Sequence, residues 1–179
     1  MYPGKYAEQN PDRSAFVMAA TGERVSYQEF EARSNRVAHY LADKGLGFQD
    51  HYSIFMENNN RYLESCAAGE RSGLYFTCIN SFLTSDELAY IINNSESQIL
   101  ITSMSKLEAA QEALAQCTAI KEVLVVGAGD ADLPEGMSDF ASTLSKYPET
   151  PLERELLGAA MLYSSGTTGR PKGIVRPLP

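Results

Sequence analysis

The clearest chemical signal in the sequence is a ten-residue segment rich in glycine and hydroxyl side chains. It holds three glycines, four hydroxyls and one lysine, in the order Ser164-Ser165-Gly166-Thr167-Thr168-Gly169-Arg170-Pro171-Lys172-Gly173. Glycine lets backbone N–H groups turn toward an anion without hindrance from a Cβ atom, and hydroxyls donate to phosphate oxygens. Lys172 adds a mobile positive charge, and Pro171 stiffens the chain just before it. We therefore expect a phosphate-binding loop over residues 163–173.

The segment is not a Walker A loop, because that motif places its lysine directly after a glycine and leads into a helix. Here Lys172 follows Pro171, and the apolar residues after Gly173 predict a strand. A flexible Gly/Ser/Thr linker is the simpler alternative. Two features favour phosphate binding over a linker: apolar strand candidates flank the segment, and its second half is not linker composition.

The charge distribution singles out the same part of the chain. The sequence carries 15 basic and 23 acidic side chains, for a net charge of −8, which disfavours a general nucleic-acid binder. No acid follows Glu155, so residues 166–179 carry +3 while residues 1–165 carry −11. A solvated basic tail would explain this split. A bound anion would explain it as well.

The elements that position this segment follow from apolar runs and helix-start signals. Apolar runs predict a hairpin over 15–27 and strands over 52–56, 74–79, 98–101, 123–126 and 159–163. Capping boxes, in which Ser or Thr precedes Glu by three residues, predict helix starts at Ser26, Thr84 and Ser105. A further helix is expected over 60–71, with Leu63, Ala67 and Ala68 on its apolar face.

Strands that alternate with helices predict an α/β fold with a mostly parallel sheet flanked by helices. The composition, 44% hydrophobic and 21% charged, is that of a globular protein, and the length suits one α/β unit over residues 1–179. Residues 128–158 are rich in turn residues, so we expect a surface excursion with one short helix around 138–146. The predicted loop would follow a strand end, where open α/β sheets bind ligands.

The cysteines and the lengths of the apolar runs bear on metal binding, cellular compartment and membrane insertion. Cys66, Cys78 and Cys117 are widely spaced and form no CxxC pair, which disfavours a structural zinc site. The odd count, without a signal-peptide pattern, predicts reduced thiols and a cytoplasmic protein. No apolar run reaches the roughly 18–20 residues of a membrane span. A third hypothesis for the function is a redox or thiol enzyme that uses Cys78, but a single unpaired cysteine is its only support.

Residues 163–173 closely resemble the phosphate-loop signature of the adenylate-forming enzymes: acyl-CoA synthetases, peptide-synthetase adenylation domains and luciferases. Weaker resemblances lie at 10–15, 25–30, 45–50, 57–59 and 73–80. The chain departs from the family pattern at His51, where relatives often carry arginine, and at Cys78-Ile79, which replaces a proline and an aliphatic residue. The resemblance is closest to the acyl-CoA synthetases, particularly the fatty-acid ligases.

This resemblance implies that ATP and Mg²⁺ activate a carboxylic acid as an acyl-adenylate, which coenzyme A then converts to a thioester. It implies catalytic roles for Lys172 and Thr167, and nucleotide-binding roles for Ser164, Ser165, Gly166, Thr167, Thr168, Gly169, Lys172 and Gly173. Relatives are much longer and hold their adenine, metal and acyl-pocket residues further on. We therefore expect an N-terminal fragment that is inactive alone. The alternative is a truncated, non-catalytic module that binds a nucleotide or a partner.

Overall fold

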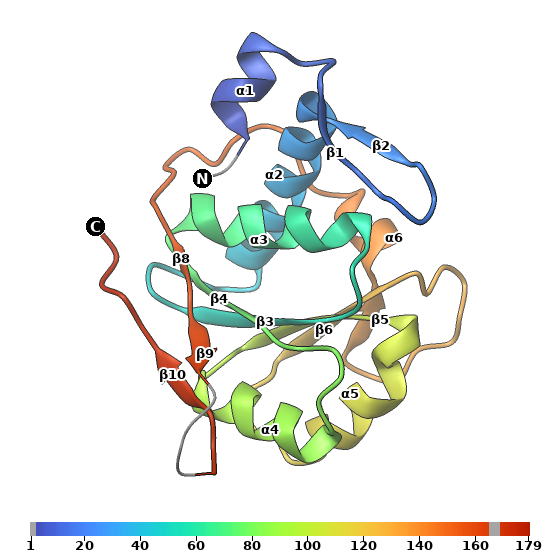
Figure 1. Ribbon diagram of the computed structural model, residues 1–179, viewed down its shortest axis with the longest axis vertical. Helices are drawn as coiled ribbons and strands as arrows, with labels where there is room; N and C mark the ends of the chain where they lie inside the picture. Colours follow the sequence, from blue (N-terminus) through green and yellow to red (C-terminus); the bar gives the residue numbers. More distant parts are fainter. Residues whose placement is uncertain (1–2, 165–168) are drawn as a thin grey trace.

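The structure is a computed structural model that describes residues 3–164 and 169–179 (Figure 1). Its centre is a six-stranded sheet in which every neighbouring pair of strands is parallel. In spatial order the strands are β7 (Met137–Asp139), β6 (Glu122–Val126), β5 (Ile99–Ser103), β3 (His51–Phe55), β4 (Tyr75–Cys78) and β8 (Ala159–Ala160). The predicted α/β class with a mostly parallel sheet is confirmed.

Helices cover both faces of this sheet (Figure 1). One face carries α2 (Tyr27–Asp43), α3 (Asn60–Ser72) and α6 (Phe140–Leu144), and the other carries α4 (Ser85–Asn94) and α5 (Leu107–Leu114). The short helix α1 (Gly4–Gln9) contacts α2, and the 3-10 turn η1 (Met104–Lys106) leads into α5. Among the described residues, no helix combines the length and the apolar character needed to cross a bilayer.

Two antiparallel hairpins lie outside the main sheet. The first joins β1 (Ser14–Val17) to β2 (Arg24–Ser26), as the sequence predicts. The second joins β9 (Leu162–Ser164) to β10 (Lys172–Ile174) and lies at the β8 edge of the sheet, beside α4 (Figure 1).

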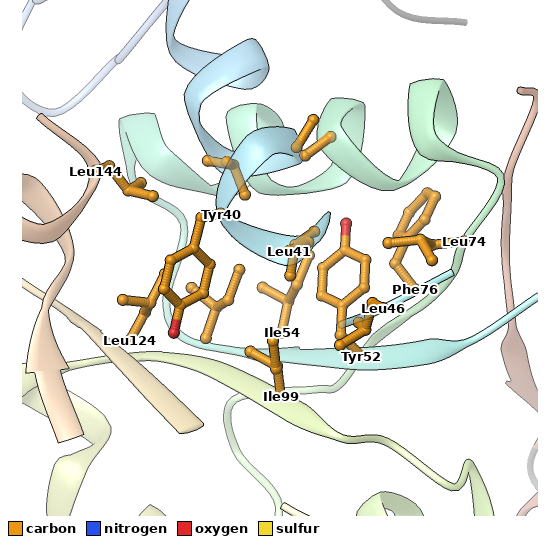
Figure 2. Packing of buried hydrophobic residues seen from close by; sticks show 14 of the residues in the cluster. Tyr40, Leu41, Leu46, Tyr52, Ile54, Leu74, Phe76, Ile99, Leu124 and Leu144 are labelled. Carbon is orange, nitrogen blue, oxygen red and sulfur yellow. The ribbon is translucent and has the colours of Figure 1, made fainter. Parts of the chain in front are cut away.

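Successive residues of the central strands alternate between two hydrophobic cores. Ile54 of β3 and Ile101 of β5 face α2 and α3, whereas Phe55 and Leu100 face α4 and α5. Figure 2 shows the first core, in which Tyr40 of α2 is directed at the sheet. Burial on both faces explains why these strands are near-continuous apolar runs in the sequence.

Two of the three predicted capping boxes form. In each, the hydroxyl accepts from the backbone N–H of the glutamate, whose carboxylate accepts in return; the pairs are Ser26 with Glu29, and Thr84 with Glu87. The third prediction was wrong, because Ser105 lies within η1 and α5 begins two residues later. The Ser105 hydroxyl instead donates to the carboxylate of Glu57 at 2.5 Å. This acceptor lies just beyond the end of the neighbouring strand β3.

Two further expectations need correction. Leu63 is 45% exposed, whereas Ala67 and Ala68 are buried as predicted. The polar side chain of Glu64 takes the buried place next to Leu63, because arginines of α2 and α3 pair with it. Residues 128–158 are more than a surface excursion, since they supply β7, the edge strand beside β6. Three residues of mixed polarity give no strand signal in the sequence.

Candidate functional site

The strand predicted over 159–163 divides in two at Met161. Its first part, β8, pairs in parallel with β4, and its second part, β9, leaves the sheet to pair with β10. Met161 is buried, and its N–H donates to the Phe76 carbonyl at 2.9 Å, so the chain is held to the sheet edge up to this residue. The predicted phosphate loop therefore lies on a hairpin that leaves the edge of the parallel sheet.

The two ends of the predicted loop pair with each other in this hairpin. Lys172 lies opposite Ser164, and Gly173 lies opposite Tyr163. A Cβ atom on Gly173 would lie 2.4 Å from Met161 Cε and 3.2 Å from the Tyr163 ring. A larger residue at this position would therefore require the end of the Met161 side chain and the Tyr163 ring to shift.

The structure describes four of the predicted nucleotide-binding residues, and all four are exposed: Ser164, Gly169, Lys172 and Gly173. Gly169 has a φ of 102°, a backbone conformation that favours glycine. The other four lie outside the described residues: Ser165, Gly166, Thr167 and Thr168. The catalytic role expected of Thr167 therefore stays a prediction.

The positive charges beside the loop are not neutralised by nearby acids. Lys172 forms no ion pair with any carboxylate in the part of the chain that the structure describes. Lys44, by contrast, pairs with Glu122 at 2.8 Å. The guanidinium of Arg170 lies 5.1 Å from the centroid of the Tyr90 ring, a cation–π contact that leaves its charge in place. Among the described residues of this acidic chain, Arg170 and Lys172 thus carry positive charge that no carboxylate pairs with.

Helix α4 holds both strands of the hairpin. The Tyr90 hydroxyl donates to the carbonyl of Pro171 at 3.0 Å, and the Tyr163 hydroxyl donates to Asn94 Oδ1 at 2.8 Å. Burial raises the pKa of Tyr163 to about 12, so this hydroxyl remains a donor at neutral pH. Tyr90 and Asn94 share one helix face through their four-residue spacing. That spacing was the available signal, but it does not show which segment covers the face.

A third tyrosine fastens the chain beyond β10. The hydroxyl of Tyr75, the first residue of β4, donates to the Arg176 carbonyl at 2.6 Å. The ring of His51 stacks on that of Tyr75 at 4.8 Å, and burial lowers the pKa of His51. The hairpin is thus tied to α4 on one side and to the edge of the main sheet on the other.

The pattern of the whole chain identifies its family. Residues 5–177 match the AMP-binding enzyme family. The chain belongs to this family. The hairpin, whose Lys172 has no acidic partner among the described residues, lies within the matched range. The acyl-CoA synthetase resemblance is also confirmed, because the relatives below are CoA ligases.

Two curated AMP-binding relatives match most of this chain. A 3-oxocholest-4-en-26-oate–CoA ligase of Rhodococcus rhodochrous is 31% identical over 169 residues. A medium/long-chain-fatty-acid–CoA/3-oxocholest-4-en-26-oate–CoA ligase of Mycolicibacterium smegmatis is 30% identical over 169 residues. Each match covers 92% of this chain but only 30% of the relative. The chain therefore spans less than a third of the length of these relatives.

A solved structure confirms the fold. An anthranilate CoA ligase in complex with anthranoyl-AMP superimposes with a TM-score of 0.80 at 20% sequence identity. The match covers 97% of this chain and 34% of the ligase. The parallel sheet with helices on both faces is thus the arrangement found in this part of a CoA ligase.

Proposed function

We propose that this chain carries the phosphate-binding loop of an ATP-dependent CoA ligase that acts on a fatty acid. The observation that carries the proposal is Lys172, a lysine without a described acidic partner at the loop end of a hairpin in an AMP-binding enzyme. The fatty-acid class is supported by the Mycolicibacterium smegmatis relative, whose name includes medium- and long-chain fatty acids. ATP, coenzyme A and the acid are the proposed substrates.

The proposed reaction has two steps. The carboxylate of the acid attacks the α-phosphorus of ATP, which forms an acyl-adenylate and releases pyrophosphate. The thiol of coenzyme A then attacks the acyl carbon, forms a thioester and releases AMP. Negative charge builds on the departing pyrophosphate in the first step, and Lys172 is positioned to stabilise it. A preorganised donor of this kind is typically worth about 2.7–4 kcal/mol of the barrier.

Ser164 and Thr167 are assigned supporting roles in the same step. The hydroxyl of Ser164, opposite Lys172 across the hairpin, would donate to a phosphate oxygen. The role of Thr167 rests on its place in the loop signature. Within the described residues, no group of three or more His, Cys, Asp or Glu side chains could hold a metal ion. The family resemblance implies that the residues that would hold Mg²⁺ lie further on in longer relatives, and no step here is routed through the metal.

We also propose that the protein is located in the cytoplasm. All three cysteines are unpaired, which supports a reducing compartment, the cytoplasm.

ATP–pyrophosphate exchange with a panel of fatty acids tests the proposal. The assay uses a longer protein, in which this chain is followed by the part of the enzyme that its relatives have in addition. In that protein, Lys172→Ala should slow exchange by about 10²–10³-fold. The KM for the acid should change little, because Lys172 acts on the pyrophosphate. Lys146→Ala is the matched control, since Lys146 is an exposed lysine distant from the hairpin in sequence. Exchange at the wild-type rate in Lys172→Ala would contradict the role of this lysine.

The same assay tests the expectation that the 179-residue chain is inactive alone. Because the chain spans only 30% of its relatives, we expect no exchange above the background rate. Clear turnover by the chain alone would contradict this expectation. Nucleotide binding without exchange in the longer protein would favour the non-catalytic module instead.

A further inference from the structure

Two cysteine thiols meet where strand β4 ends. The Sγ atom of Cys66, on α3, lies 3.6 Å from the Sγ atom of Cys78, the last residue of β4. The two cysteines are 12 residues apart in the sequence and form no CxxC motif, so their spacing does not predict this contact. The return of the chain from α3 into β4 brings them together. The thiols are therefore in direct contact across the helix–sheet interface.

The two thiols have different surroundings. Cys78 is exposed, whereas Cys66 is partly buried against the hydrophobic core beneath α3. Cys78 is thus the more accessible member of the pair, and we expect a small molecule to reach its sulfur before that of Cys66.

The contact also makes the two thiols unequal as nucleophiles. The hydrogen bond from the Cys66 thiol lowers the pKa of Cys78 to about 7 against the opposing effect of burial, and the Tyr62 hydroxyl adds a further donor. The same contact, together with burial, raises the pKa of Cys66. Cys78 is therefore the thiol of the pair that ionises more readily and attacks first, and Cys66 is the one that keeps its proton.

We propose that Cys66 and Cys78 form a reversible dithiol–disulfide site that reacts with small-molecule disulfides. In the first step, the Cys78 thiolate attacks one sulfur of the small disulfide. A Cys78 mixed disulfide forms, the sulfur–sulfur bond of the small molecule breaks, and one small thiolate leaves. In the second step, Cys66 gives up its proton and attacks Cys78 Sγ. A Cys66–Cys78 bond forms and the second small thiolate leaves.

The exchange balances in electrons and protons. Two protein thiols are oxidised to one disulfide, and the small disulfide is reduced to two thiols that carry the two protons. Closure shortens the distance between the sulfur atoms from 3.6 Å to about 2.05 Å. The product would link α3 covalently to β4, the strand that pairs with β8 ahead of the hairpin.

Cys117 provides the matched control within the same chain. Its thiol lies just after α5, 3.3 Å from the carbonyl of Ala113, and burial raises its pKa. Among the described residues, no hydrogen bond or short contact joins it to another sulfur. Because Cys78 is more exposed than Cys117, faster reaction at Cys78 alone would not support the proposal; the deciding result is a bond between Cys66 and Cys78 while Cys117 keeps its thiol.

Oxidised glutathione tests the proposal on the full 179-residue chain. After incubation at pH 7.5 and quenching by alkylation, the chain should carry one alkyl group, on Cys117, where the reduced chain carries three. Apart from this label, its mass should be two hydrogen atoms lower, without a glutathione adduct. Peptide mapping should place the bond between Cys66 and Cys78, and dithiothreitol should reverse it. Cys117→Ser should behave as the wild type does.

Variants of the pair distinguish the two steps. Cys66→Ser removes the resolving thiol, so a glutathione adduct should accumulate on Cys78. Cys78→Ser should abolish oxidation of the pair. Circular dichroism of each variant confirms that it is folded. If Cys66→Ser is not folded, Cys66→Ala replaces it in the experiment. An unreactive wild-type chain, a stable adduct on wild-type Cys78, or a disulfide that includes Cys117 would each overturn the proposal.

Discussion

The hydroxyl of Tyr90 donates a hydrogen bond of 3.0 Å to the carbonyl oxygen of Pro171, the residue immediately before Lys172. The ring of Tyr90 also lies against the guanidinium of Arg170, at 5.1 Å. One side chain of α4 thus fixes the backbone next to the loop lysine, from a position 81 residues earlier in the sequence. A loop that must present charge in one geometry needs such an anchor outside itself.

Tyr90→Phe should loosen this anchor without removing the ring under Arg170. Loss of the hydrogen bond is expected to cost about 0.5–1.5 kcal/mol, felt mainly in the hairpin. Amide hydrogen exchange should therefore quicken at Lys172 and its neighbours in β10, and change little in β3 or β5. Tyr6→Phe is the control, because Tyr6 is an exposed tyrosine that stacks on Tyr27. Unchanged exchange in β10 of Tyr90→Phe would contradict the anchoring role.

Gly158→Ala should destabilise the edge of the main sheet where β8 joins β4. A Cβ atom at Gly158 would lie 2.1 Å from the carbonyl oxygen of Gly69 and 2.4 Å from that of Leu74. Both contacts are with backbone, which cannot move aside as a side chain can, so we expect a cost of about 1–3 kcal/mol. Urea unfolding measures it. Gly47→Ala is the control, since its nearest contact would be 3.8 Å, and equal stabilities of the two variants would refute the packing argument.

Arg71→Ala should be among the most destabilising substitutions in the chain. Its side chain is fully buried, with Nη2 2.5 Å from a carboxylate oxygen of Glu31 and Nε 3.2 Å from one of Glu155. Removing the cation leaves these carboxylates without it in a partly desolvated place, at a cost of about 3–5 kcal/mol. Thermal or urea unfolding provides the measurement.

The control for Arg71 is a salt bridge nearer the surface. Arg36 lies 2.6 Å from Glu149, but both side chains remain partly exposed to water. Arg36→Ala should therefore cost no more than about 1 kcal/mol. If Arg71→Ala proved as mild as Arg36→Ala, the buried cluster would not be the link between α2 and α3 that the structure indicates.

Asp139 should make the stability of the region around α6 depend on pH. Partial burial disfavours its charged form, but hydrogen bonds from the backbone N–H groups of Ser142 and Gly129 outweigh this and lower the pKa of the carboxyl. A carboxyl with a lowered pKa in the folded state stabilises the fold above its ordinary pKa of about 3.9, and this contribution is lost as the pH falls through the folded value.

The measurement compares unfolding of the wild type and Asp139→Ala between pH 7 and pH 3. Asp139→Ala should be less stable by about 1 kcal/mol at pH 7, as for a lost helix cap, and the difference should shrink below about pH 4. Asp139→Asn keeps a capping oxygen that does not titrate, so its stability should lack this component of the pH dependence. A gap between wild type and Asp139→Ala that stays constant with pH would count against the assignment.

The sequence by itself determined the elements whose signals are local. A capping box is completed within four residues, so Ser26 and Thr84 could be recognised as helix starts without knowledge of the fold. The strands β3, β5 and β6, which are buried on both faces, could be predicted from their apolar runs, and the loop signature over 163–173 indicated the family. At Ser105 the local signal did not decide the outcome, since its hydroxyl donates instead to the carboxylate of Glu57, which lies just beyond the end of β3.

Only the tertiary structure decided which distant residues meet. Nothing near Tyr90 in the sequence points to Pro171, and nothing near Cys66 points to Cys78. The same holds for the break at Met161, where the chain pairs with β4 before it leaves the sheet. Each of these contacts joins elements through the order of strands in the sheet, and that order is settled by burying both of its faces at once. Local residue patterns therefore defined the loop, and the packing of the sheet defined what holds it.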